Sequence, residues 1–186
     1  MDLHPAVERL AGLVERLPDE SLDLPTPCEA YSVAALLDHV AGGLVAFRAA
    51  AIKDPLPGGP SGDARNLAPD WRTRMPRDAR ALADAWDDPA AWTGRTAAGD
   101  VELPGDVAGI VALDEVVIHG WDLAKATATP MPVYDGPGLD ALYAFVTNSR
   151  GSELFGPEVA VPADAPLFDR ILGAAGRDPH WQPPTG

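Results

Sequence analysis

Three polar side chains share one face of a predicted helix in the second half of the chain. Glu115 and His119 are four residues apart, and Asp122 follows three residues later. An α-helix turns about 100° per residue, so it places all three on one side, within a segment that is otherwise mostly apolar. Burying such groups unpaired costs on the order of several kcal/mol. A divalent metal would remove that cost, so this helix predicts two or three ligands of a metal site.

A second histidine, His39, could complete the site. It lies at the edge of an apolar stripe in the helix predicted over 32–51. Small residues surround it, and small residues also surround Glu115 and His119. Two such faces leave volume between packed helices, which is how helical bundles build metal and ligand pockets. The three residues would supply two nitrogen ligands and one oxygen ligand, with an open position as in catalytic zinc sites.

The spacing also allows plainer interpretations. A histidine on an apolar face is often a hydrogen-bonded core residue, and Glu-x-x-x-His recurs by chance in helices. Asp122 could orient a ligand histidine, act as a general base, or belong to a hydrogen-bond network at the helix end. Cys28 could be a nucleophile or a thiolate ligand, although a single cysteine after Thr-Pro is more typical of a small buried residue.

The elements that must position these residues are mostly helical. Apolar residues recur with helical spacing over 3–17, where Pro18 ends the stripe. Further helices are predicted over 32–51 with Ser32 as N-cap, 72–86, 105–127, 138–148 and 166–175, the last ended by Gly176. Residues 54–70 are a Pro- and Gly-rich loop, and 91–103 a short hairpin or an irregular crossing. The pattern predicts an all-α four-helix bundle with additional short helices, in a single domain over 1–186.

Composition limits the partners. The 186 residues are 46% hydrophobic, which fits one soluble domain. A net charge of −14 disfavours nucleic acid and anionic lipid surfaces. The one local concentration of basic residues is interpreted as the solvated face of a helix: Arg72, Arg74, Arg77 and Arg80.

The cellular location of the protein is also predicted from the sequence. No apolar run approaches the roughly 18 residues that a membrane helix needs. No secretory signal is visible, and one cysteine excludes an internal disulfide framework. The cytoplasm is therefore expected, with no membrane partner. The sequence is compatible with a homodimer.

Three segments resemble a known family. They are Pro25-Thr26-Pro27-Cys28 leading into the helix that bears His39, the run 114–124, and Gly176-Arg177-Asp178-Pro179. In this order they resemble signatures of the DinB-like superfamily, in the metal-binding group related to the N-terminal domain of mycothiol-dependent maleylpyruvate isomerase. The resemblance covers nearly the whole chain.

The resemblance implies a four-helix bundle that holds a divalent metal, zinc or nickel, through His39, Glu115 and His119. It also implies mycothiol as a cosubstrate. Two departures matter: Tyr31 stands where the family commonly has Trp, and isomerase relatives continue into a second C-terminal domain. Maleylpyruvate isomerisation itself therefore does not follow, and the roles of Cys28 and Arg177 stay open.

The chemistry of such a site favours one activity and leaves two others. A metal with an open position lowers the pKa of a bound thiol or water and holds the anion as a nucleophile. We expect a thiol-dependent transferase or isomerase acting on a small electrophile, with Asp122 as the catalytic residue that takes the proton or orients a ligand. The alternatives are a metal-water hydrolase and a non-catalytic bundle that binds metal and a small molecule.

Overall fold

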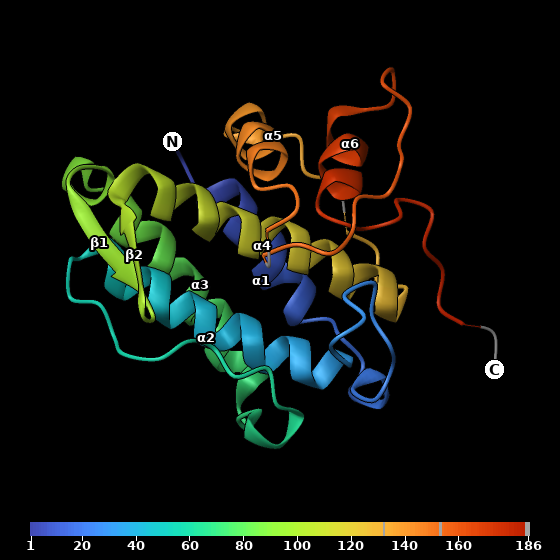
Figure 1. Ribbon diagram of the computed structural model, residues 1–186. Coiled ribbons are helices and arrows are strands. Elements are labelled where there is room, and N and C mark those ends of the chain that lie inside the picture. Colours follow the sequence, from blue (N-terminus) through green and yellow to red (C-terminus); the bar gives the residue numbers. More distant parts are fainter. Residues whose placement is uncertain (132, 153, 185–186) are drawn as a thin grey trace.

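Four helices form the body of the molecule in the computed structural model, which describes residues 1–131, 133–152 and 154–184. They are α1 (His4–Val14), α2 (Val33–Ala51), α3 (Trp71–Trp86) and α4 (Gly105–Thr127). Both α1 and α2 pack against α3 and α4, which closes a four-helix bundle (Figure 1). The predicted all-α class is confirmed.

Two shorter helices lie outside this bundle. They are α5 (Leu139–Asn148) and α6 (Leu167–Ala174), which pack against each other, and α5 also contacts α4 (Figure 1). Gly176 follows α6 with φ +79°, a left-handed conformation that favours glycine, as expected at a helix end. The segment after Gly176 returns toward α4 and brings Arg177 with it.

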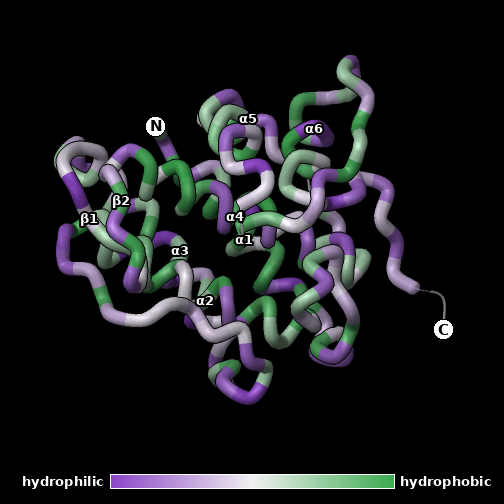
Figure 2. Tube along the Cα trace, viewed as in Figure 1, coloured by the Kyte–Doolittle hydropathy of each residue, from purple (hydrophilic) through white to green (hydrophobic). Residues whose placement is uncertain are grey.

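The core lies between the four main helices. Each contributes fully buried leucines, such as Leu10, Leu37, Leu82 and Leu113, and each such side chain stabilises the fold by about 1.5–3 kcal/mol. In Figure 2 the hydrophobic residues gather along these helices, whereas the segment joining α2 to α3 is mostly pale or purple. The helices are thus held by their apolar faces, and the connection between α2 and α3 is less hydrophobic than the helices it joins.

Helix boundaries follow local chemistry. Ser32 caps α2, because its hydroxyl accepts a hydrogen bond from the Ala35 N–H at 3.3 Å, as predicted. Helix α1 ends at Val14, earlier than its apolar stripe suggests. Leu17 lies beyond the helix end and is still buried, so the stripe marks burial rather than helix length.

A hairpin lies where α2 ends and α4 begins. Strands β1 (Arg95–Ala98) and β2 (Val101–Pro104) pair antiparallel, with Ala98 opposite Val101. The hydroxyl of Thr96 donates to the Ala50 carbonyl at 2.7 Å, which fastens the hairpin to α2. Of the two alternatives for residues 91–103, the hairpin is confirmed.

The expectation that no segment approaches the length of a membrane helix was wrong for α2, which is long and apolar enough to cross a membrane by length and composition. Most of it is buried between α3 and α4. The core helices of soluble proteins meet the same criterion, so this property of α2 is weak evidence for a membrane span.

Candidate metal centre

His39 projects from α2 toward α4 through a wall of small residues. Ala35 and Gly43 lie one turn to either side of it. A Cβ atom at Gly43 would lie 3.8 Å from Oε2 of Glu115, so the two helices approach closely at this level. Small residues thus allow the imidazole of one helix to meet the carboxylate of the other.

Glu115 and His119 come from successive turns of α4 and meet His39 between the helices. Oε2 of Glu115 lies 3.2 Å from Nε2 of His39 and 3.6 Å from Nε2 of His119. The two imidazole rings are 5.1 Å apart and nearly perpendicular. The structure therefore brings the three predicted ligands together around one point.

The separation of these atoms fits a shared metal ion. Zinc bonds of about 2.0–2.1 Å at tetrahedral angles place two ligand atoms about 3.3 Å apart. The distances from Glu115 to His39 and His119 lie on either side of that value. All three ligand atoms fall within 4.8 Å of one another.

One carboxylate oxygen of Glu115, Oε2, is buried, although the side chain as a whole is 23% exposed. Its Oε2 has no hydrogen-bond partner among the described residues, because the approach of His39 lacks hydrogen-bond geometry. Burial raises the pKa of Glu115, but contact with His39 and the positive field of His119 outweigh it, and the net pKa is lowered. A buried carboxylate that stays ionised without a hydrogen-bond donor suits a metal ligand.

The second nitrogen of His119 contacts Asp122. Nδ1 lies 3.0 Å from Oδ2 of Asp122, which has no exposed surface. Because an ionised carboxylate can only accept, Nδ1 is the donor in this contact, and Nε2 is the nitrogen that faces Glu115. Metal-bound histidines commonly donate their other N–H to a carboxylate in this way, which fixes the tautomer and orients the ring.

Asp122 is also paired with Arg177. The guanidinium donates from Nη2 to Oδ2 at 3.1 Å, and from Nη1 to the Ala175 carbonyl at 2.8 Å. Burial lowers the pKa of Arg177, but Asp122 more than compensates, so the net pKa is raised. With His119 and Arg177 both engaged on it, Asp122 is better placed to orient His119 than to take a proton from a substrate.

Cys28 lies beside this network. Its sulfur is within 4.8 Å of a His119 nitrogen and an Asp122 oxygen. Burial raises the pKa of the Cys28 thiol despite the nearby Arg177, and a protonated thiol is a poor metal ligand. The placement favours packing over ligation.

Tyr31 forms one wall of the centre. Its ring stacks on His39, with centroids 5.2 Å apart and planes 27° apart. Gly62 of the loop between α2 and α3 also lies against that ring, and a Cβ atom there would overlap the tyrosine. The loop therefore contacts a predicted metal ligand through one aromatic side chain.

Asp114 is a buried carboxyl group that sequence reasoning did not single out. Its Oδ1 has no hydrogen-bond partner among the described residues. Burial first, and the neighbouring Glu115 second, raise the pKa of Asp114 well above its usual range. Helix α4 is buried over most of its circumference, so apolar periodicity could not distinguish this position from an exposed one.

The fold and the convergence of two histidines and a glutamate between α2 and α4 define a DinB-like helical bundle with a candidate metal centre. A sequence model of the mycothiol maleylpyruvate isomerase N-terminal domain matches residues 3–124. The chain belongs to that family. The matched span includes His39, Glu115, His119 and Asp122, whereas Arg177 lies beyond it.

Known proteins resemble this chain in sequence or in structure. Two uncharacterized proteins of Mycobacterium tuberculosis, from strains CDC 1551 / Oshkosh and ATCC 25618 / H37Rv, are each 29% identical over 181 residues, covering 92% of this chain and 93% of theirs. The crystal structure of the mycothiol-dependent maleylpyruvate isomerase matches with a TM-score of 0.67 at 18% identity, covering 97% of this chain and 92% of that one. A histidine-to-alanine mutant of the isomerase matches with a TM-score of 0.63 at 21% identity, covering 94% and 86%.

The extent of the structural match bears on one expectation from the sequence. The isomerase relatives were expected to carry a C-terminal domain without a counterpart in this chain. The match covers 92% of the isomerase chain, so this comparison does not support that difference. At 18% identity it establishes the shared fold and leaves the activity to be argued from the site.

Proposed function

We propose that this protein is a divalent-metal-dependent enzyme that uses a low-molecular-weight thiol, mycothiol or a close analogue, to act on a small electrophilic substrate. The reaction is a thiol transfer or an isomerisation. The observation that carries the proposal is the convergence of His39, Glu115 and His119, with one buried carboxylate oxygen left without a hydrogen-bond donor. Membership of a family named for a mycothiol-dependent isomerase supports the choice of thiol.

The residues of the site have separate tasks in this proposal. His39, Glu115 and His119 would hold the metal, and zinc or nickel suits two imidazoles and a carboxylate. When bound, the metal would lower the pKa of a coordinated thiol and keep it as a thiolate. Asp122 keeps the Nε2 lone pair of His119 directed at the site.

Access and shielding come from the surrounding side chains. The small residues Ala35 and Gly43 bring α2 close to α4 and leave the side chains of His39 and Glu115 16% and 23% exposed, and a small thiol would reach the ligands from that exposed side. Tyr31 covers one face of His39 and keeps water from that side. Three protein ligands leave at least one coordination position for the cosubstrate.

Two other functions are compatible with the same centre. A metal-bound water could hydrolyse a substrate without any thiol. Alternatively, the bundle could bind metal and a small molecule without turnover. The geometry is common to all three, so the distinction has to come from reactants and products.

Metal content is the first test of the proposal. Elemental analysis of the purified protein should find about one divalent metal per chain. The double variant His39→Ala, His119→Ala should lose it, because a single carboxylate remains. Equal metal in the wild type and the double variant would overturn the assignment of the ligands.

The reaction is tested with defined reactants. The metal-loaded protein is mixed with mycothiol and an aryl halide, and in a separate assay with maleylpyruvate and a catalytic amount of mycothiol. We expect thiol-dependent adduct formation or isomerisation, lowered about 100-fold or more in Glu115→Gln, which keeps the shape and removes the charge. A hydrolysis product formed without thiol would identify a hydrolase, and ligand binding without any product would identify a binding protein.

We further propose that the chain forms one domain that works in the cytoplasm, where thiols are kept reduced. Its net charge of −14 supports the absence of nucleic-acid partners. The burial of most of α2 supports the absence of a membrane partner.

A further inference from the structure

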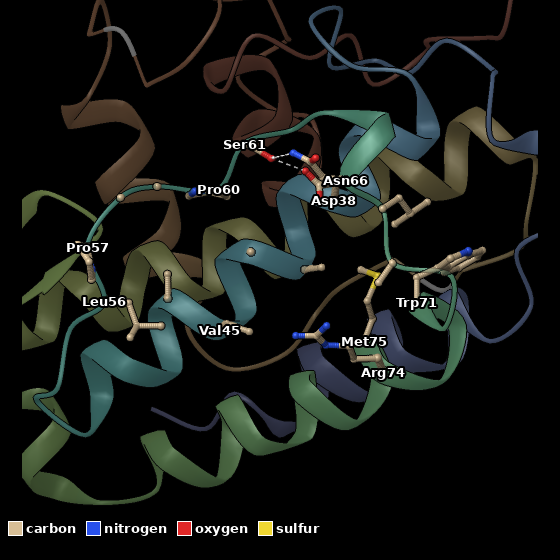
Figure 3. A pocket seen from close by; sticks show the side chains of 17 residues that line it. Asp38, Val45, Leu56, Pro57, Pro60, Ser61, Asn66, Trp71, Arg74 and Met75 are labelled. Carbon is tan, nitrogen blue, oxygen red and sulfur yellow. Dashed lines mark hydrogen bonds between the residues drawn. The ribbon is translucent and has the colours of Figure 1, made fainter.

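A second cavity lies on the outer side of α2, away from the metal centre. It is a groove of about 400 Å³ between α2, the loop of residues 56–68 and the start of α3 (Figure 3). None of His39, Glu115 and His119 lines it. Asp38 does, because consecutive helical residues point about 100° apart. The volume is within the range of small-molecule sites, about 300–1,000 Å³.

One end of the groove is polar and held in place. Oδ2 of Asp38 accepts hydrogen bonds from the Ser61 hydroxyl at 2.6 Å and from the Asp63 N–H at 3.0 Å. The amide nitrogen of Asn66 donates to the Ser61 hydroxyl at 3.2 Å. Oδ1 of Asp38 and the amide oxygen of Asn66 have no hydrogen-bond partner among the described residues, so this end offers acceptors for hydroxyl groups.

The other end is cationic. Arg74 reaches from α3 toward Val45 of α2 (Figure 3). Its Nε donates to Asp78 at 3.2 Å, whereas its two terminal nitrogens have no partner among the described residues. Arg77 also donates to Asp78, so two guanidinium groups share one carboxylate and Asp78 does not fully neutralise Arg74.

The four arginines of α3 therefore do not form one uniform solvated face. Arg72 donates to the Leu17 carbonyl and lies over the Trp71 ring, and Arg80 pairs with Glu8. Arg74 alone among them lines the groove. The guanidinium of Arg74 therefore offers free hydrogen-bond donors to an anion in the groove. The net charge of the whole chain is −14, so this attraction is local to the groove.

The wall between the two ends is apolar and shaped by small residues. Pro60 packs directly against Gly42, and a Cβ atom added at Gly42 would lie 2.8 Å from Cβ of Pro60. Further apolar lining comes from all three segments, for example Val45 of α2, Leu67 of the loop and Met75 of α3. The loop is further tied to the hairpin, where the Gly58 N–H donates to Asp100 at 3.2 Å.

From this arrangement we propose that the groove is a second small-molecule site, for a hydroxylated ring that carries one carboxylate. The carboxylate pairs with the terminal nitrogens of Arg74, the ring lies on the apolar wall of α2, and a hydroxyl donates to Asp38 or Asn66. This site is independent of the metal centre and of the thiol chemistry proposed there.

The test is an amide NMR titration of the metal-loaded protein with 4-hydroxybenzoate. Saturable shifts should centre on Asp38, Val45, Asn66 and Met75. The neutral 4-hydroxybenzamide should bind more weakly by about tenfold or more, because it lacks the charge-assisted bonds. Benzoate should also bind more weakly, because it lacks the hydroxyl group.

Two arginine variants separate a specific site from general charge attraction. Arg74→Gln should weaken 4-hydroxybenzoate by about tenfold or more. Arg77→Gln removes the same charge from the same helix outside the groove, and should change the affinity by no more than about twofold. Val45→Phe, which fills the groove without a change of charge, should abolish the shifts and leave the metal content unaltered.

Three results would overturn the proposal. One is an absence of shifts in the groove. Another is equal weakening by Arg74→Gln and Arg77→Gln, which would indicate general charge attraction. The last is loss of binding in His119→Ala, a substitution outside the groove, which would place the carboxylate on the metal.

Discussion

Arg177 donates to the carboxylate of Asp122 across 55 residues of sequence, and both side chains are buried. Asp122 also accepts from His119, so two side chains connect the segment after α6 to a proposed metal ligand. A buried ion pair is tolerated when hydrogen bonds satisfy both partners. Arg177 meets this condition through its second bond, to the Ala175 carbonyl.

The first prediction concerns this pair and the stability of the fold. Arg177→Ala should lower the free energy of unfolding by about 3–5 kcal/mol, because it leaves Asp122 as a buried charge without its cation. Urea unfolding of the metal-loaded protein measures the change. Arg170→Ala is the matched control: Arg170 bonds the Tyr143 hydroxyl outside the main bundle, so its loss should cost about 1 kcal/mol. Similar losses for the two variants would contradict a special role of Arg177.

The second prediction separates orientation of a ligand from ligation. Asp122→Asn keeps the shape of the side chain and removes its charge. The variant should still bind about one metal per chain, while its metal affinity or turnover falls by about 10–100-fold, as for other groups that orient a metal-bound histidine. Metal content and turnover are measured on the same preparation. Complete loss of the metal would place Asp122 among the ligands themselves.

The third prediction concerns the single cysteine. Cys28→Ser should retain both the fold and the metal, since burial keeps the thiol protonated. Circular dichroism and elemental analysis provide the two readouts. If the Cys28→Ser variant contained no metal, Cys28 would be a ligand and the proposed coordination shell would have to be revised.

The fourth prediction is a pH dependence of stability away from the site. Burial raises the pKa of Tyr134 to about 12, from 10.0 in the unfolded chain. The native state therefore holds a proton that the unfolded state releases above about pH 10. The contribution of Tyr134 to the free energy of unfolding is fully present below that pH. It declines by on the order of 1–2 kcal/mol as the pH rises toward 12.

Tyr134→Phe provides the comparison. It cannot titrate, so its free energy of unfolding should change less between pH 10 and 12 than that of the wild type. At neutral pH it should be less stable by about 1 kcal/mol, because the hydroxyl no longer donates to the Pro137 carbonyl. Parallel curves for the two proteins across the alkaline range would show that Tyr134 does not set this dependence.

The helices and the proposed ligands could be predicted from the sequence because each rests on local spacing. Glu115 and His119 lie one turn apart, and the cap at Ser32 and the glycine after α6 are local signals. His39 was predicted from the small residues around it on the helix over 32–51, and the resemblance to a family supported that choice.

The remaining features depend on contacts between distant segments. No periodicity links Arg177 to Asp122, and the contact of Tyr31 with Gly62 depends on how the loop between α2 and α3 folds back. Arg74 was grouped with its neighbours as a solvated face, because a sequence does not reveal which helical position borders a cavity. Packing of the loop on α2 creates that cavity.

The most direct test of the central claim is a thiol titration of the cobalt-substituted protein. If His39, Glu115 and His119 hold a metal with an open position, a small thiol should bind the cobalt and add a sulfur-to-metal charge-transfer band that saturates at one thiol per metal. The band should be absent from the double variant His39→Ala, His119→Ala at the same protein concentration. A cobalt spectrum of the wild type that stays unchanged on saturation with thiol would contradict the account.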